Sequence, residues 1–150
     1  MKEIQNRRQY FRHDFSIPLC TEMRIIKIGT KNVETSKTLV CVKNISAGGL
    51  LFETNLNIPV RADVTFEFTM TVCHKELILP GMIKRRHDLA QQQYQYGVEF
   101  LLSEQEKSNL VSMFNEMSVK LHKKGNAGCS LCSTDRKGCY KIKQKKQVKI

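Results

Sequence analysis

The clearest evidence for the fold lies between Val64 and Met70, where the chain reads VTFEFTM and apolar and polar side chains alternate. A period of two predicts a β-strand with one buried and one exposed face. The longer segment from Ser16 to Lys27 alternates in the same way, with mostly apolar side chains at the odd positions. We therefore expect most of the chain to form β-structure.

Shorter apolar runs bounded by turn residues continue this pattern. They lie at residues 39–42, 50–52, 77–79, 82–84 and 94–101. Gly29 to Asn32 predicts a turn, and Pro80-Gly81 separates two of the runs. Turn signals at intervals of roughly 8–12 residues are typical of small barrels and sandwiches. We expect a small six- or seven-stranded antiparallel β-barrel, because a closed barrel leaves no strand edge exposed.

The pattern changes at Ser103, where a C-terminal α-helix is predicted to begin. Ser103 and Glu106 have the spacing of a capping box, in which each side chain accepts a hydrogen bond from the other residue's backbone N–H. Apolar residues then recur every three or four positions, at Leu110, Met113, Phe114, Met117 and Leu121. We expect this stripe to cover the barrel or a second copy of the protein, and the glycines at 125 and 128 to end the helix.

The overall composition is that of a globular protein. Of the 150 residues, 41% are hydrophobic and 26% are charged, which excludes collagen-like, fully disordered and membrane-embedded proteins. No apolar run approaches the roughly 18 residues that span a bilayer, and the N-terminus lacks the apolar stretch of a secretory signal. We expect a cytoplasmic protein whose cysteines are reduced thiols or metal ligands. Cys20, Cys41 and Cys73 lie within strand patterns and are predicted to be buried.

Positive charge is concentrated near the C-terminus. Residues 1–118 hold 15 Lys and Arg against 13 Asp and Glu, whereas residues 119–150 hold 10 against 1. The predicted domain is therefore almost neutral, which argues against nucleic acid as its partner. We divide the chain into a flexible arginine-bearing segment at 1–15, a barrel with its helix at 16–124, and a basic cysteine-containing tail at 125–150.

Three arginines, Arg7, Arg8 and Arg12, precede the first predicted strand. Their guanidinium groups repel one another, so their clustering in an almost neutral domain indicates an anionic partner. Arginine can bind a phosphate through two hydrogen bonds and can also stack on a purine. A solvated basic segment is the alternative interpretation.

A second polar cluster, at residues 44–49, lies between two predicted strands and reads NISAGG. Asn44 and Ser46 can bond to the local backbone or offer donors and acceptors to a ligand. Gly48 and Gly49 permit a positive φ and the close approach of another backbone or of a ligand. An ordinary tight turn is the alternative.

Together the two clusters resemble the motifs of the PilZ family, with RRxxxR at residues 7–12 and NxSxxG at residues 44–49. Residues 81–85 resemble the family's later G-x-V-x-R strand, residues 96–100 its closing strand, and residues 103–122 the helix that follows. The resemblance covers residues 6–122. Asn44 stands where many members carry Asp.

PilZ domains are bacterial receptors for the second messenger cyclic di-GMP, and the resemblance implies this function here. It assigns ligand binding to Arg7, Arg8, Arg12, Asn44, Ser46, Gly48 and Gly49. It also implies that the arginine segment folds onto the barrel around the ligand and creates a surface for an unidentified protein partner. Members of the family act on motility, biofilm formation, exopolysaccharide synthesis or virulence. The sequence leaves open whether one ligand or a stacked pair binds, and whether the protein is a monomer or a homodimer.

The sequence predicts no catalytic site. The four histidines, at positions 13, 74, 87 and 122, have no carboxylate or nucleophile at a recognised catalytic spacing. We expect His13 and Asp14 to form a polar pair where the chain enters the barrel. The protein is therefore predicted to bind a ligand and not to be an enzyme.

The C-terminal tail carries Cys129-Ser130-Leu131-Cys132, followed by Cys139. These three cysteines with His122 would supply the four ligands that zinc prefers, although H-x6-C is not a usual zinc spacing. A redox-sensitive dithiol and an unstructured tail are alternatives. Two other functions therefore stay open: a PilZ-like adaptor that binds no nucleotide, and metal or nucleic-acid binding through the tail.

Overall fold

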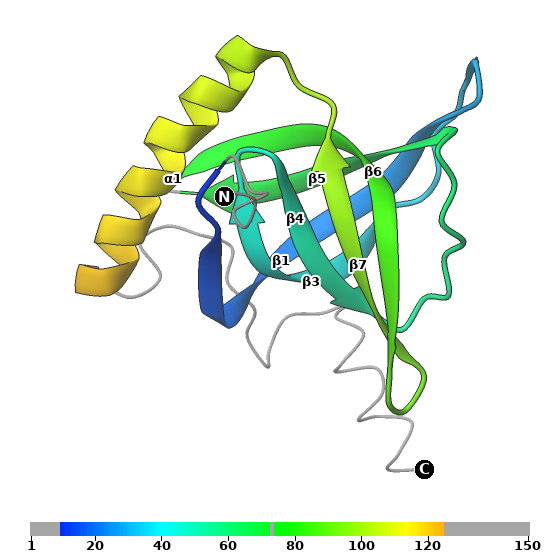
Figure 1. Ribbon diagram of the computed structural model, residues 1–150, viewed down its shortest axis with the longest axis horizontal. Helices are drawn as coiled ribbons and strands as arrows, with labels where there is room; N and C mark the ends of the chain where they lie inside the picture. Colours follow the sequence, from blue (N-terminus) through cyan, green and yellow to red (C-terminus); the bar gives the residue numbers. More distant parts are fainter. Residues whose placement is uncertain (1–9, 73, 125–150) are drawn as a thin grey trace, which may run out of the picture.

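The structure, a computed structural model, describes residues 10–72 and 74–124. Within these residues it has seven β-strands followed by one helix (Figure 1). The elements are β1 (His13–Ile28), β2 (Lys31–Asn32), β3 (Thr38–Ser46), β4 (Gly49–Thr54), β5 (Val64–Val72), β6 (Lys75–Leu89), β7 (Gln93–Phe100) and α1 (Glu104–Lys124). The mostly β fold with a C-terminal helix is confirmed.

The strands form one antiparallel sheet that closes on itself. Their order is β2-β1-β3-β4-β7-β6-β5, and β5 also pairs with β1. The length of β1 makes closure possible, because its earlier part pairs with β3 and its later part with β5, and both pairings include Glu22 and Met23. Six strands thus form the barrel. The short β2 folds back on β1 after a turn at Gly29, which has a φ of 63°.

The alternation that predicted β5 produces the interior of the barrel. From Val64 to Val72 every second side chain is buried and the intervening ones are partly exposed. In the interior, the ring of Phe52 on β4 contacts those of Phe68 on β5 and Tyr96 on β7, with ring centroids 5.7 and 5.1 Å apart. Burial of such large rings supplies much of the hydrophobic stabilisation of a small core.

One predicted break is absent, because β6 runs through Pro80 and Gly81 without interruption. Pro80 lies opposite Glu67 on β5, and its carbonyl accepts a hydrogen bond from the Leu101 N–H at 2.9 Å. Proline lacks only the backbone donor, so its carbonyl can still take part in pairing. The two apolar runs on either side of this dipeptide therefore form one strand.

The predicted burial of Cys20 and Cys41 is confirmed. The two residues lie opposite each other on β1 and β3. Cys73 lies outside the described residues.

Helix α1 begins with the predicted capping box. The Glu106 carboxylate accepts a hydrogen bond from the Ser103 N–H at 2.8 Å, and the Ser103 hydroxyl oxygen accepts one from the Glu106 N–H at 3.2 Å. The bond from the Ser103 N–H stabilises the ionised carboxylate and lowers the pKa of Glu106. The sequence thus located the start of the helix correctly.

The apolar stripe of α1 covers the barrel. Leu110, Phe114 and Met117 are buried in the same core as the strand residues, and the ring centroid of Phe114 lies 6.0 Å from that of His13 on β1. Figure 1 shows the helix along one side of the barrel, with the start of the described chain between them. The sequence left open whether this stripe covers the barrel or a second copy of the protein, and in the structure it covers the barrel. The side chain of Leu121 lies outside the described part.

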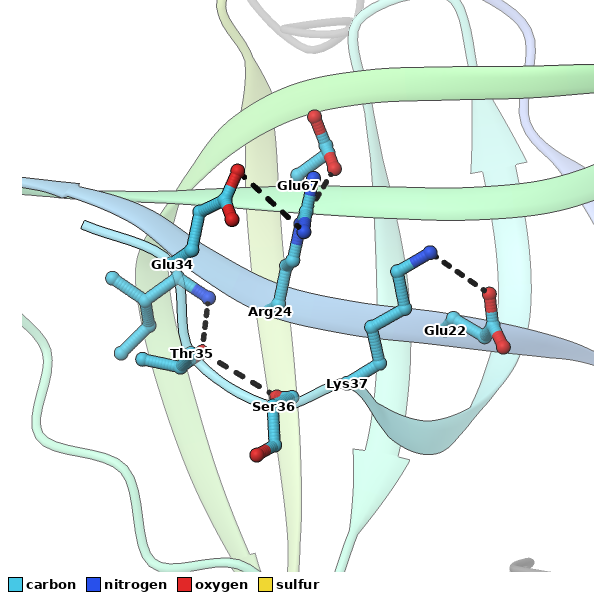
Figure 2. A network of polar contacts seen from close by, with 8 residues as sticks. Glu22, Arg24, Glu34, Thr35, Ser36, Lys37 and Glu67 are labelled. Atoms are coloured by element: carbon cyan, nitrogen blue, oxygen red, sulfur yellow. Dashed lines mark hydrogen bonds and ion pairs between the residues drawn. The ribbon is translucent and has the colours of Figure 1, made fainter. Parts of the chain in front are cut away.

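A polar network on the outside of the barrel holds the segment between β2 and β3. Arg24 Nε lies 2.9 Å from the Glu67 carboxylate on β5, and Arg24 also faces Glu34 at 4.0 Å (Figure 2). The Thr35 hydroxyl accepts a hydrogen bond from the Ile25 N–H at 2.9 Å. None of these residues lines the groove described below.

In the part of the chain that the structure describes, no helix combines the length and the apolar character that a transmembrane span needs.

Candidate functional site

A groove of about 430 Å³ lies on the outer face of the barrel and crosses β3, β4, β7 and β6. The segment before β1 and the beginning of α1 also contribute to it. The residues that line it are Tyr10, Arg12, Asn44, Ser46, Gly48, Gly49, Leu50, Leu51, Lys84, Arg85, Gly97, Val98, Glu99 and Lys107. The groove therefore joins residues that lie far apart in the sequence.

Strand register places these residues in two rows across the sheet. One row consists of Asn44, Leu51, Gly97 and Arg85, each opposite the next on a neighbouring strand. The other consists of Ser46, Gly49 and Glu99. Regular alternation between the two faces of a strand explains why Leu51 and Glu99 face outward, since their neighbours Leu50, Phe52, Val98 and Phe100 lie in the core.

The NxSxxG segment forms a tight hairpin rather than a loop. β3 continues to Ser46 and β4 begins at Gly49, so Ala47 and Gly48 alone form the turn. The Ser46 hydroxyl oxygen accepts a hydrogen bond from the Gly48 N–H at 3.1 Å, which stabilises the turn. Neither glycine adopts a positive φ, so the conformational reason considered for them from the sequence was wrong.

Close approach, the other reason considered for these glycines, is confirmed at Gly49. A Cβ on this residue would lie 1.9 Å from the carbonyl oxygen of Val98 on β7. Gly97 is less crowded, because a Cβ there would lie 3.0 Å from Nε of Arg85, near the end of a flexible side chain. Because Gly49 has no side chain, β7 can approach β4 closely at this point. Because Gly97 has none, the Arg85 guanidinium group can lie across the floor of the groove.

The groove carries an excess of positive charge. Its cationic side chains are Arg12, Lys84, Arg85 and Lys107, and its carboxylate is Glu99. Glu99 lies 3.7 Å from Lys84, in an exposed ion pair. Such a concentration of cations within an almost neutral domain favours binding of an anion.

The segment before β1 connects the groove to the helix. The Tyr10 ring lies over the turn, with its Cδ2 atom 3.3 Å from the place of a Cβ on Gly48. The Tyr10 hydroxyl donates a hydrogen bond to the Glu104 carboxylate at 3.3 Å. Lys107 lies 3.8 Å from the same carboxylate group. The NxSxxG turn, the N-terminal segment and the first turns of α1 therefore meet at one end of the groove.

Most of the binding residues proposed from the sequence lie together. Those that line the groove are Arg12, Asn44, Ser46, Gly48 and Gly49. Arg7 and Arg8 lie outside the described residues, as do the three tail cysteines 129, 132 and 139 and the side chain of His122. The zinc site and the role of the first two arginines are therefore not tested by the structure.

Three cations of the groove, Lys84, Arg85 and Lys107, were not singled out from the sequence as ligand contacts. Lys84 and Arg85 lie in a stretch that resembles a family motif, which was the available signal. Lys107 gave none, because a lysine early in an amphipathic helix looks like an ordinary surface residue.

A second hollow of about 330 Å³ adjoins the groove and shares Arg12, Leu51, Arg85 and Gly97 with it. Arg86, which also lines this hollow, already has partners. Its Nε lies 2.8 Å from the Asp88 carboxylate, which raises the pKa of Arg86 and lowers that of Asp88. Its guanidinium carbon lies 4.7 Å from the centroid of the Tyr94 ring. The cation that Arg86 adds to this hollow is therefore already paired with a carboxylate.

The donor set suits an anion with polar edges better than it suits a metal. Among the described residues no three His, Cys, Asp or Glu side chains come together in a way that could hold a metal ion. The groove offers guanidinium and ammonium groups, an amide and a hydroxyl. These groups can bind phosphates and the hydrogen-bonding edge of a base.

Solved structures with the same architecture include the Bacillus subtilis inhibitor of motility (MotI/DgrA), with a TM-score of 0.56 and 17% identity over 83% of this chain and 56% of that one. The K. pneumonia MrkH–c-di-GMP complex has a TM-score of 0.56 and 14% identity over 81% of this chain and 57% of that one. Escherichia coli YcgR in complex with c-di-GMP has a TM-score of 0.54 and 14% identity over 80% and 50%. These similarities show a shared fold. The chain spans between 50% and 57% of the length of these three proteins.

The sequence comparison defines the family. No curated protein matches the chain. The family described as "PilZ domain" matches residues 6–116, a range that includes all seven strands and more than half of α1. The chain therefore belongs to the PilZ family.

Proposed function

We propose that this protein is a receptor for cyclic di-GMP and that the groove across β3, β4, β7 and β6 is its binding site. The observation that carries the proposal is the groove itself, which is lined by four cations and one carboxylate together with Asn44 and Ser46. Membership of the PilZ family supports it, as do the MrkH and YcgR structures, which were solved with c-di-GMP.

The ligand combines two phosphates with two flat guanines in a compact ring. Arg12 and Arg85 can each hold a phosphate through two hydrogen bonds or stack on a base, because a guanidinium group is both planar and charged. The absence of a side chain at Gly97 keeps the floor of the groove low. The volume of about 430 Å³ falls within the usual range for small-molecule sites.

Asn44 and Ser46 supply the contacts that can distinguish guanine. The Ser46 hydroxyl oxygen already accepts the Gly48 N–H, so its proton can be donated to a ligand. Guanine presents two acceptors, O6 and N7, on one edge, whereas adenine replaces O6 by an amino donor. A donor at Ser46 therefore favours guanine, and the Asn44 amide can donate or accept as required.

The mechanism proposed is a switch without a chemical step. Arg7 and Arg8 would bind the ligand from the side opposite the barrel, and their segment would fold over it. Tyr10 and Arg12, which already line the groove, support this route because they connect those arginines to it. Ordering of a segment by a ligand creates a surface that a protein partner can recognise.

Calorimetric titration of cyclic di-GMP into the full chain tests the proposal, with GMP as the control ligand. We expect a Kd in the micromolar range, equivalent to about −8 kcal/mol, and much weaker binding of GMP, which has one base and one phosphate. Absence of measurable binding of cyclic di-GMP at concentrations well above this range would overturn the proposal and leave the nucleotide-independent adaptor.

A further inference from the structure

Lys107 of α1 is directed into the groove although it belongs to the helix and not to the barrel. Its side chain is only 18% exposed, whereas that of its ion-pair partner Glu104 is 83% exposed. It lines the same groove as Arg12, Ser46 and Gly48. A lysine held mainly within such a groove can bring its ammonium group to a bound anion.

The stability of the helix does not explain a lysine at this position. The Lys107 N–H bonds to the Ser103 carbonyl at 3.0 Å, so the residue lies at the start of the helix. The positive end of the helix dipole is there, and a cation at that end is unfavourable. The ion pair with Glu104 offsets little of this unfavourable interaction with the helix dipole, because an ion pair at 3.8 Å with an exposed carboxylate adds little stability.

The surroundings of Lys107 connect it to the proposed ligand contacts. Tyr10 packs on Gly48 at one end and donates a hydrogen bond to Glu104 at the other. The Gly48 carbonyl accepts a hydrogen bond from the Phe100 N–H at 2.9 Å, just before the helix. A ligand that contacts the turn between β3 and β4 therefore lies beside the first turns of α1.

We propose that Lys107 binds a phosphate of the ligand, so that helix α1 forms part of the nucleotide site together with the barrel. The inference rests on the proposed function and specifies it further. Lys107 would exchange the exposed Glu104 carboxylate for the phosphate. A compact ammonium group with three donors and no acceptor suits a phosphate oxygen and not the acceptor-and-donor edge of a base. Ligand binding would thereby tie the helix to the barrel turn.

The test compares Lys107→Gln with Lys37→Gln by titration of cyclic di-GMP. Lys37 is a matched control, since it is also paired with a carboxylate, Glu22 at 3.6 Å, and does not line the groove. Both variants lose one positive charge. We expect Lys107→Gln to bind about tenfold more weakly, the usual loss for one charge-assisted hydrogen bond, and Lys37→Gln to bind within about twofold of the wild type. Lys107→Arg should restore most of the affinity, and Lys107→Met repeats the test if the glutamine variant does not fold.

NMR spectroscopy provides a second test, because it can detect a change at the Lys107 side chain itself. In NMR spectra of the wild type, the ε-methylene signals of Lys107 should shift on addition of cyclic di-GMP and stay unchanged with the same concentration of inorganic phosphate. Wild-type affinity in Lys107→Gln, or Lys107 signals that do not respond to the ligand, would overturn this inference and leave the receptor function intact. A wild type that binds no cyclic di-GMP would instead refute the proposed function, and this inference with it.

Discussion

Gly49 packs against the main chain of Val98 so closely that a Cβ on Gly49 would lie 1.9 Å from the Val98 carbonyl oxygen. Real Cβ atoms do not approach another atom to this distance, and a backbone carbonyl in a paired strand cannot move aside alone. The glycine is therefore required for β4 and β7 to pair at this point. Gly48 differs, because a Cβ there would meet side-chain atoms, the Tyr10 ring at 3.3 Å and Ser46 Oγ at 3.8 Å, and would not clash with backbone.

Gly49→Ala should destabilise the barrel, whereas Gly48→Ala should leave it folded. Forcing extra atoms into a packed site usually costs about 1–3 kcal/mol, and the clash at Gly49 is with backbone. At Gly48 the Tyr10 ring can rotate, so we expect a change in unfolding free energy below about 1 kcal/mol. Denaturant unfolding of both variants measures the difference. Equal stability of Gly49→Ala and the wild type would show that β4 and β7 separate without cost.

The sequence was sufficient to predict the barrel and the capped helix, and it singled out the NxSxxG residues that line the groove. Those features depend on local patterns, such as the alternation along β5 and the spacing of Ser103 and Glu106. The cationic side of the groove depends on register between distant strands. Lys84 and Arg85 are adjacent, so a regular strand would place them on opposite faces. An irregularity in the pairing between Ile83 and Arg85 leaves both exposed, and no local pattern in the sequence indicates it.

His13 makes the folded state sensitive to acid. Burial lowers the pKa of His13 from its ordinary value of about 6.5, and the neighbouring Asp14 raises it by a smaller amount. The unfolded chain therefore takes up a proton at a higher pH than the folded one. The stability from this residue is complete above about pH 6.5 and falls as the pH drops from there toward the lowered folded value.

Unfolding of the wild type and of His13→Phe between pH 8 and pH 5 isolates this effect. Phenylalanine keeps an aromatic ring next to Phe11 and Phe114, whose centroids lie 4.9 and 6.0 Å from that of His13, but it cannot titrate. We expect the wild type to lose more stability on acidification than the variant. Parallel pH profiles would show that the charge on His13 costs nothing in the folded protein.

Arg12→Ala should weaken binding of cyclic di-GMP by at least about tenfold without unfolding the barrel. A hydrogen bond between charged groups contributes roughly 1.5–3 kcal/mol, so loss of one guanidinium group should weaken binding by about tenfold or more. Arg61→Ala is the matched control, because Arg61 is paired with Asp63 at 2.7 Å and lines neither hollow. Calorimetry gives the affinities and circular dichroism the fold. Equal affinities of the two variants would remove Arg12 from the site.

Ser46→Ala should weaken binding of cyclic di-GMP and also reduce the preference for it over cyclic di-AMP. The hydroxyl can donate to guanine O6, whereas adenine carries an amino donor at that position. Removal of the donor therefore affects the guanine ligand more. A neutral hydrogen bond contributes about 1 kcal/mol, so we expect a loss of roughly fivefold for cyclic di-GMP and a smaller change for cyclic di-AMP. Titration of both dinucleotides into both proteins gives the ratio. The same substitution removes the acceptor for the Gly48 N–H. If the loss came only from damage to this turn, binding of both dinucleotides would weaken equally. That outcome would contradict a direct contact between Ser46 and the base.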